Sequence, residues 1–189
     1  GAPGDTEIGW TLESTTRLNE NWRDWPFPAK KRFLERLQTT TTLSDVSESR
    51  PPWRSIAREK QLPPDGDWRV WLLRAGRGFG KTRTGAEWIL EQVAAGCKRI
   101  ALVARTAADA REVMVEGESG IMVCSPDSDR PRYEPSKRRL TWNSGAIATT
   151  YSADEPDLLR GPAHDAAWCD ELATWQRPET FDMMMFGLR

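Results

Sequence analysis

The chain has 189 residues, of which 38% are apolar and 29% are charged, and its formal net charge is −1. This length and composition suit one folded domain with a sizeable core, and no apolar run of about 18 residues exists that would span a bilayer. A charge so close to zero gives no overall attraction to a polyanion, so any contact with nucleic acid has to come from a local patch or from parts of the protein that this sequence lacks.

Cysteine usage and the N-terminal residues narrow the class further. Cys97, Cys124 and Cys169 are odd in number, far apart and without histidine spacing, which argues against a disulfide framework and a zinc site. We expect reduced thiols in the core. Gly1–Trp10 lacks the basic and then apolar pattern of a signal peptide, so nothing directs the chain out of the cytosol.

Residues 1–52 are expected to form a polar N-terminal arm and linker that is partly disordered. Within the arm, Ala29–Leu37 predicts a short amphipathic helix. Thr39–Pro52 is rich in small polar residues, which bury too little apolar area to offset the entropy of the chain. The globular part is therefore expected at residues 53–189.

The globular part alternates between strand and helix patterns, which is typical of an α/β domain. Apolar residues recur with helical spacing after the first strand, and Gly, Asn and Ser mark the turns. In chain order we first predict a strand at Trp68–Leu73, a helix at Thr82–Ala95 that Gly96 ends, and a strand at Arg99–Ala104. A second helix is expected to begin with a capping box of Thr106 and Asp109 and to run to about Glu116, before Gly117. The remaining predicted strands are Leu140–Trp142 and Ala146–Tyr151, joined by the turn Asn143-Ser144-Gly145, and Ala166–Cys169.

The segment from Ala75 to Thr82 reads AGRGFGKT and fits the phosphate-loop pattern GxxxxGK[ST], with Ala75 at the first glycine. Its glycines let backbone N–H groups converge on phosphate oxygens, and the following helix directs its positive end at them. Lys81 would reach the β- and γ-phosphates, and Thr82 would place its hydroxyl on Mg²⁺. The alternative is a plain glycine-rich turn from strand to helix. The predicted nucleotide-binding residues here are Ala75, Gly76, Arg77, Gly78, Phe79, Gly80, Lys81 and Thr82.

An acidic pair, Asp170-Glu171, follows the last predicted strand. Hydrolysis of a bound triphosphate needs a carboxylate site at the end of a strand near the loop. We expect Asp170 to hold Mg²⁺ through its water shell and Glu171 to accept a proton from the attacking water. The alternative is a solvated acidic pair that caps the next helix.

Two further side chains are candidates. Arg77, inside the loop, could neutralise charge that develops on the γ-phosphate, or it could simply face solvent. Gln61, before the first strand, carries an amide that can present both a donor and an acceptor to adenine, or it is a plain loop glutamine.

Several phrases in this order resemble the large terminase subunit of tailed bacteriophages, an ATP-driven motor that packs DNA into a procapsid. They are KQLPPDGDWRVWLL, GRGFGKTRTGAEW, RIALVARTAADAREVMVEGESGI and YSADEPDLLRGPAHDAAWCDELATW, and they lie between Trp53 and Arg189. The resemblance implies a P-loop NTPase three-layer sandwich with a mainly parallel central sheet, incomplete at its C-terminal end. In this family a further strand with a coupling motif and then a nuclease domain normally follow, and the chain stops where that strand should begin.

The resemblance also implies roles, position by position. Gln61 becomes the adenine-side residue, Arg77 and Lys81 the loop cations, and Thr82 and Asp170 the Mg²⁺ partners. Glu171 becomes the catalytic base, assisted by Arg77, and ATP and Mg²⁺ are the ligands. Arg160-Gly161 is a candidate sensor of nucleotide or DNA. The implied partners are double-stranded DNA, the small terminase subunit and the portal protein. The full-length protein is expected to form a homo-oligomeric ring. Its expected location is the cytoplasm of the bacterial host, with no association with a membrane.

Two alternative functions stay open. A helicase-like P-loop ATPase shares the loop and the acidic pair, and motifs downstream of Arg189 would distinguish it. A nucleotide-binding remnant would bind ATP without turnover, and phosphate release would distinguish that.

Overall fold

The computed structural model describes residues 51–189. The predicted helix at Ala29–Leu37 and nearly all of the predicted arm, residues 1–52, lie outside the described residues. The described residues form one unit, from Pro51 to Arg189.

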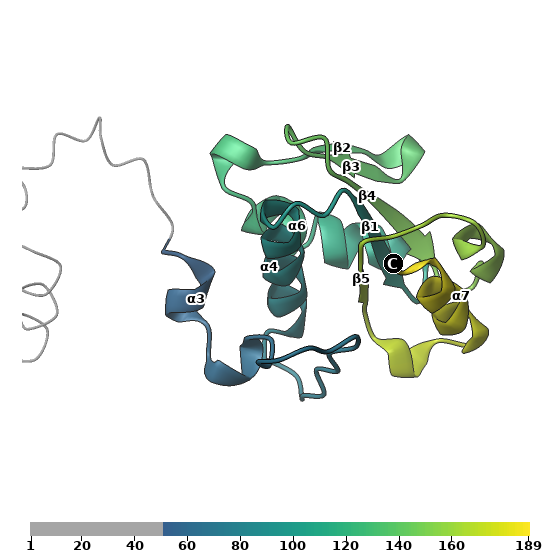
Figure 1. The fold of residues 1–189 in the computed structure, drawn as a ribbon, viewed down its shortest axis with the longest axis horizontal. Coiled ribbons are helices and arrows are strands. Elements are labelled where there is room, and N and C mark those ends of the chain that lie inside the picture. Colours follow the sequence, from purple (N-terminus) through teal and green to yellow (C-terminus); the bar gives the residue numbers. More distant parts are fainter. Residues whose placement is uncertain (1–50) are drawn as a thin grey trace, which may run out of the picture. The chain divides into compact units, whose positions relative to one another are not determined.

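Five strands form one sheet in the order β2-β3-β4-β1-β5 (Figure 1). The central strand β1 (Arg99–Ala104) pairs in parallel with β4 (Ile147–Ser152) and with β5 (Ala166–Cys169). The strand β3 (Arg139–Thr141) is antiparallel to β4, and β2 (Arg132–Glu134) is antiparallel to β3. Four of the five strands therefore point the same way, which confirms the expected mainly parallel sheet.

The central strands form where the sequence predicts them. All of β1 after Arg99 is buried, as expected for a parallel strand covered on both faces. The turn between β3 and β4 is closed by hydrogen bonds from Trp142 N to Ala146 O and from Gly145 N to Trp142 O, both 3.0 Å long. Gly145 has φ +82°, a conformation that glycine adopts without strain. The predicted hairpin and the strand Ala166–Cys169 are therefore confirmed.

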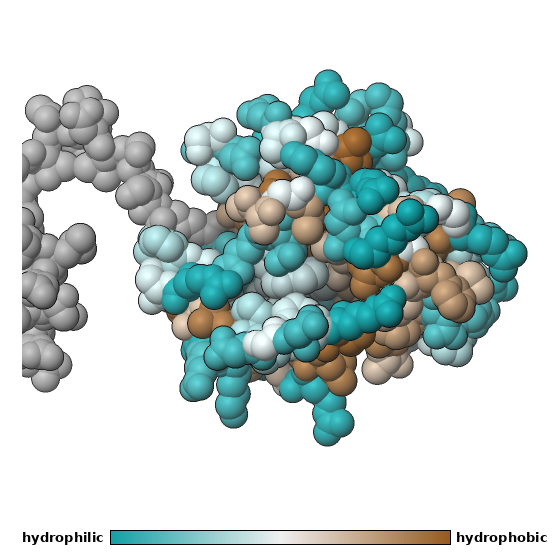
Figure 2. Space-filling view, in the orientation of Figure 1, coloured by the Kyte–Doolittle hydropathy of each residue, from teal (hydrophilic) through white to brown (hydrophobic). Residues whose placement is uncertain are grey.

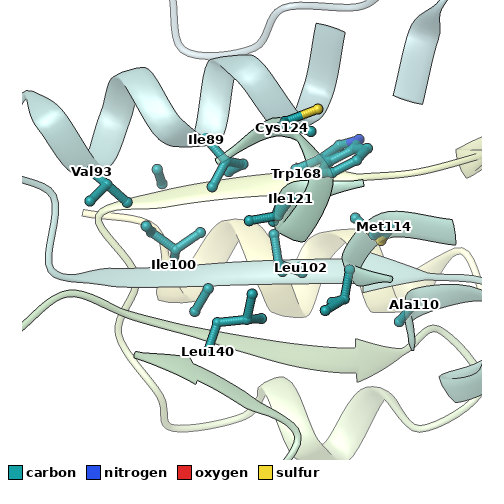
Figure 3. Close-up of a cluster of buried hydrophobic side chains, with 14 of the residues drawn as sticks. Ile89, Val93, Ile100, Leu102, Ala110, Met114, Ile121, Cys124, Leu140 and Trp168 are labelled. Carbon is teal, nitrogen blue, oxygen red and sulfur yellow. The ribbon is translucent and has the colours of Figure 1, made fainter. Parts of the chain in front are cut away.

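One face of the sheet is covered by α4 (Lys81–Ala94), α6 (Ile121–Cys124) and the π-helical η3 (Ala110–Val115). Figure 3 shows Ile89 and Val93 of α4 close to Ile100 and Leu102 of β1, all of them buried. The 3.6-residue period of α4 places its apolar side chains on this face.

The opposite face is covered by η6 (Pro156–Leu159) and α7 (Glu179–Gly187). Ala101 and Val103 of β1 point to this side because alternate residues of a strand face opposite ways. The sheet thus lies between two helical layers, as the expected three-layer sandwich requires.

The helix ends follow local signals. The helix α4 ends in a Schellman arrangement, in which Cys97 N donates to Gln92 O and Gly96 N donates to Val93 O, each over 3.0 Å. Gly96 has φ +104°, which explains the glycine. Thr106 caps the next helical segment through its contact with Asp109 N, 3.1 Å away, so the predicted cap is confirmed. That segment runs as α5 (Ala107–Asp109) and η3, and Glu116 closes it one residue before the expected Gly117.

The predicted strand at Trp68–Leu73 is wrong, since the segment has no regular secondary structure. Val70 is 54% exposed and Leu72 is 71% exposed, while the Trp68 ring lies 6.1 Å from that of Trp71 and 6.4 Å from that of Trp88 in α4. Strand propensity depends on pairing with a neighbour. Among residues 51–189 no strand pairs with this segment, and its tryptophans pack on one another and on α4 instead.

Several elements were not predicted from the sequence. Most of them are too short to show a repeating pattern of apolar residues, and α7 follows a polar loop without a signal for the start of a helix. These elements are α3 (Trp53–Ile56), η2 (Glu59–Gln61), α6, η4 (Asp127–Asp129), β2, η5 (Pro135–Lys137), η6, η7 (Leu172–Thr174) and α7. One parallel bridge joins Leu188, just after α7, to His164.

One face of the described unit is drawn by the hydropathy of its residues in Figure 2. The face in Figure 2 is largely hydrophilic, with apolar residues gathered in separate patches. Within residues 51–189, no helix combines the length and the apolar character needed to cross a membrane.

Candidate functional site

The glycine loop lies directly before α4 and forms its N-terminal end. Gly80 is the N-cap residue with φ +84°, and Gly78 has φ +74°, so both positions favour glycine. A Cβ added at Gly76 or Gly78 would meet nothing within 4 Å, so open space surrounds this part of the loop. The 14-residue helix directs the positive end of its dipole toward the loop. The loop therefore has the backbone freedom and the field that suit an anion.

Lys81 connects the loop to the end of β5. Its Nζ donates to Ala75 O over 3.2 Å and lies 3.7 Å from Glu171 Oε1. The side chain of Lys81 is 29% exposed and that of Glu171 is 56% exposed, so solvent screens this ion pair and weakens it. The geometry brings together two residues that lie 90 positions apart in the chain, at 81 and 171.

The acidic pair lies where β5 leaves the sheet. Asp170 N donates to Val103 O over 2.8 Å, and Trp175 Nε1 donates to Asp170 O over 3.0 Å. Glu171 has φ +47°, which is uncommon for a residue with a side chain. This sharp turn leaves the Asp170 carboxyl half-buried while Glu171 is exposed. The two neighbours therefore have different surroundings.

The Asp170 carboxyl is in surroundings that disfavour its charge. Burial raises its pKa above the ordinary value of 3.8, and the nearby Glu171 raises it further, while Lys81 acts in the opposite direction. Asp109 of α5 adds to the increase in pKa. Asp109 was predicted only as a capping residue, and no sequence pattern indicated that it lies near Asp170. A cation beside Asp170 would offset this unfavourable charge.

The helix α4 packs closely against β5 at Gly85. A Cβ added at Gly85 would lie 2.2 Å from Trp168 Cε2 and 2.6 Å from Trp168 Nε1. Only glycine therefore fits where α4 crosses Trp168. The sequence contained this residue within a predicted helix, but nothing in the pattern indicated its role.

Gln61 lies against the glycine loop and is 7% exposed. Its Nε2 donates to Phe79 O over 3.1 Å and to Thr84 Oγ1 over 3.3 Å. Its Oε1 accepts from Arg58 N over 3.1 Å and from Arg58 Nε over 3.2 Å. Arg58 also donates from Nη2 to Phe79 O, and its guanidinium lies 4.7 Å from the centre of the Phe79 ring. Sequence reasoning did not single out Arg58, because no motif marks it.

The structure does not place all of the remaining predicted site residues near Lys81 and the acidic pair. Thr82 is half-buried in the first turn of α4, next to Lys81, and Arg77 is exposed on the loop. Arg160 follows η6, and its Nη2 lies 3.7 Å from Asp157 Oδ1. It lines a cavity of about 170 Å³ together with Met183 and Phe186 of α7. The structure therefore places Arg160 beside α7, whereas Lys81, Glu171 and Asp170 meet at one end of the sheet.

Comparisons with known proteins show which family this chain belongs to. The family model described as terminase large subunit, T4likevirus-type, N-terminal matches residues 72–187. No curated protein matches the chain. Among solved structures, the large terminase ATPase domain of a Thermus phage is similar, with 18% identity, a TM-score of 0.44, and coverage of 60% of this chain and 54% of that one. This chain thus spans about half the length of that relative. The family match includes the loop and the acidic pair but not Gln61.

Proposed function

This chain belongs to the family of T4-like-virus-type large terminase subunits, whose N-terminal part it matches, and from that premise we propose that it binds and hydrolyses ATP. The observation that carries the proposal is the distance of 3.7 Å between Lys81 Nζ and Glu171 Oε1. It supports a site in which a phosphate-binding cation and a carboxylate base serve the same phosphoryl group. In the whole protein, this hydrolysis would power the packaging of double-stranded DNA into a procapsid.

The loop residues Ala75–Thr82 bind the triphosphate in this proposal. Backbone N–H groups of the loop and of the first turn of α4 hold the phosphate oxygens, and Lys81 leaves Ala75 O and Glu171 to contact the β- and γ-phosphates. Arg77 is exposed on the same loop, where its guanidinium can neutralise charge that develops on the γ-phosphate. The half-buried Thr82 would offer its hydroxyl oxygen to the metal.

The two residues of the acidic pair, Asp170 and Glu171, have different roles in this proposal. Glu171 is exposed and accepts a proton from the attacking water once Lys81 has turned to the phosphates. Asp170 is half-buried, and burial and the charge of Glu171 raise the pKa of its carboxyl; a metal ion beside it would favour the ionised form, so we assign Asp170 to the metal. The different surroundings of the two neighbours support this division.

Magnesium fits the donor atoms of the site. Thr82 and Asp170 offer oxygen ligands only, and Mg²⁺ prefers oxygen, keeps several waters and takes further ligands from phosphates. Within residues 51–189 no group of three or more His, Cys, Asp or Glu residues is arranged to enclose a metal ion. A metal held in part by the nucleotide suits that finding. When bound, Mg²⁺ would neutralise negative charge on the phosphates.

The partners in this proposal follow from the family. They are double-stranded DNA, the small terminase subunit and the portal protein, and the full-length protein would form a homo-oligomeric ring in the cytoplasm of the bacterial host. Arg160, 70% exposed beside α7, is a candidate contact for DNA or a sensor of nucleotide.

Binding is tested by thermal unfolding with ATP and Mg²⁺. Ligand at about 100 times its Kd stabilises the folded state by about 2.7 kcal/mol, which raises Tm by roughly 5–10 °C. Lys81→Ala should abolish this shift, whereas Lys137→Ala, a change at an exposed lysine, should preserve it. An equal shift in the Lys81→Ala variant would refute the loop assignment.

Hydrolysis is tested by release of phosphate. Glu171→Gln should keep the thermal shift and lose turnover, because the amide preserves the shape but accepts no proton. Asp170→Asn should weaken binding in Mg²⁺ but not binding measured in EDTA. A parent that binds ATP and releases no phosphate supports the remnant without turnover, and Glu171→Gln with parental turnover places the base elsewhere.

A further inference from the structure

We infer that Arg58 and Gln61 act together as positioning residues, which clamp the carbonyl of Phe79 and thereby aim the phosphate-binding loop. The inference rests on the proposed function. It gives Gln61 a role toward the loop in place of the adenine-side role that the family resemblance implies, and it adds Arg58, which the resemblance leaves out.

Both side chains of the clamp converge on one backbone oxygen. Phe79 O accepts hydrogen bonds from Gln61 Nε2, at 3.1 Å, and from Arg58 Nη2. A carbonyl oxygen has two lone pairs, so these two donors fill its capacity. The Arg58 guanidinium also lies 4.7 Å from the centre of the Phe79 ring, a cation–π distance. The residue at the centre of the loop is thus held through both its backbone and its side chain.

Fixing the Phe79 carbonyl also fixes the next N–H group. The Phe79–Gly80 peptide is planar and trans, so the N–H of Gly80 points opposite to the Phe79 carbonyl. The clamp therefore turns the Gly80 N–H away from Gln61. Gly80 is also held at φ +84°, and a Cβ there would lie only 3.0 Å from Gln61 Nε2. Gln61 contacts the loop too closely to allow another group between them.

The amide of Gln61 has no capacity left for a base. An amide offers two donor hydrogens and two acceptor lone pairs. Its donors serve Phe79 O and Thr84 Oγ1, and its oxygen accepts from both N and Nε of Arg58. Reading adenine would break two of these bonds at a side chain that is only 7% exposed. The clamp keeps all four.

The experiment compares three probes in Mg²⁺: ATP, GTP and inorganic tripolyphosphate, which has no base. Arg58→Ala and Gln61→Ala should each weaken binding of all three by the same factor, about tenfold for loss of a charged or paired hydrogen bond. Arg58→Lys should recover part of the affinity, because one ammonium can still reach Phe79 O. Lys60→Ala, a change at an exposed neighbour in η2, is the matched control and should leave all three affinities unchanged.

A second readout needs no ligand. The ¹⁵N resonance of the Gly80 amide responds to hydrogen bonding at the preceding carbonyl, so it should move in Arg58→Ala and in Gln61→Ala but not in Lys60→Ala. Loss of ATP affinity in Gln61→Ala, with GTP and tripolyphosphate binding unchanged, would overturn the clamp and restore adenine reading. An unmoved Gly80 resonance would overturn it as well. Failure of the proposed function looks different, because the parent would then bind none of the three probes.

Discussion

The contact between Gly85 and Trp168 makes a quantitative prediction. A Cβ at position 85 would lie 2.2 Å from Trp168 Cε2, whereas ordinary contacts begin near 3.4 Å. Gly85→Ala therefore forces α4 or the indole to retreat by about 1 Å, and overpacking of this kind costs about 1–3 kcal/mol. Alanine is more favourable than glycine within a helix by about 1 kcal/mol. The net loss of unfolding free energy in the parent background should thus be about 0–2 kcal/mol.

Introducing Gly85→Ala into a Trp168→Leu variant separates the cost of overpacking from the gain in helix propensity. In Trp168→Leu the indole is gone, so Gly85→Ala should stabilise the protein by up to about 1 kcal/mol through helix propensity alone. The double-mutant cycle should then give an interaction energy of about 1–3 kcal/mol. Gly76→Ala is the control for the chemical change itself, because its Cβ would meet nothing within 4 Å.

The assay is urea unfolding followed by circular dichroism, with unfolding free energies extrapolated linearly to water. We expect variants that are less stable at this contact also to bind ATP more weakly, because Lys81 begins α4 and lies near Glu171. Additive effects of Gly85→Ala and Trp168→Leu would refute the reasoning, because they would mean that the helix does not rest on this ring.

Two further predictions concern the dependence of stability on pH. Hydrogen bonds from the Arg99 side chain and from the N–H groups of Lys98 and Arg99 lower the pKa of Asp165 from 3.8 to about 2. Its contribution to stability is complete above about pH 4 and disappears as pH falls toward 2, so Asp165→Asn should lower the urea midpoint at pH 7 but not at pH 2. A pH-independent difference would contradict this. Burial, and then the charge of Arg99, lower the pKa of His164 below 6.5, so the unfolded chain takes up a proton that the folded chain resists. The free energy of unfolding should therefore fall below about pH 6.5, and His164→Leu should flatten that part of the profile; an unchanged slope would show that His164 titrates normally.

The sequence by itself determined the parts that local patterns specify. Arg99–Ala104 and Ala166–Cys169 form strands with the predicted bounds, because short apolar runs between turn signals are typical of strands in a covered sheet. The glycine loop, the start of α4 and the cap at Thr106 also follow from residues within a few positions of one another. Lys81 and Asp170-Glu171 were singled out for the same reason, and their roles toward a nucleotide stay predictions.

Tertiary structure alone decided how those parts meet. Lys81 lies 3.7 Å from Glu171, and Gly85 lies against Trp168; both contacts join residues far apart in the chain, which no local period encodes. Arg58 carries no motif, and its contact with Phe79 O appears only in the tertiary structure. The failed strand at Trp68–Leu73 has the same cause, because a strand needs a partner, and within residues 51–189 this segment has none, while its Trp68 packs on Trp88 of α4. Local propensity sets what a segment can become, and non-local contacts decide what it becomes.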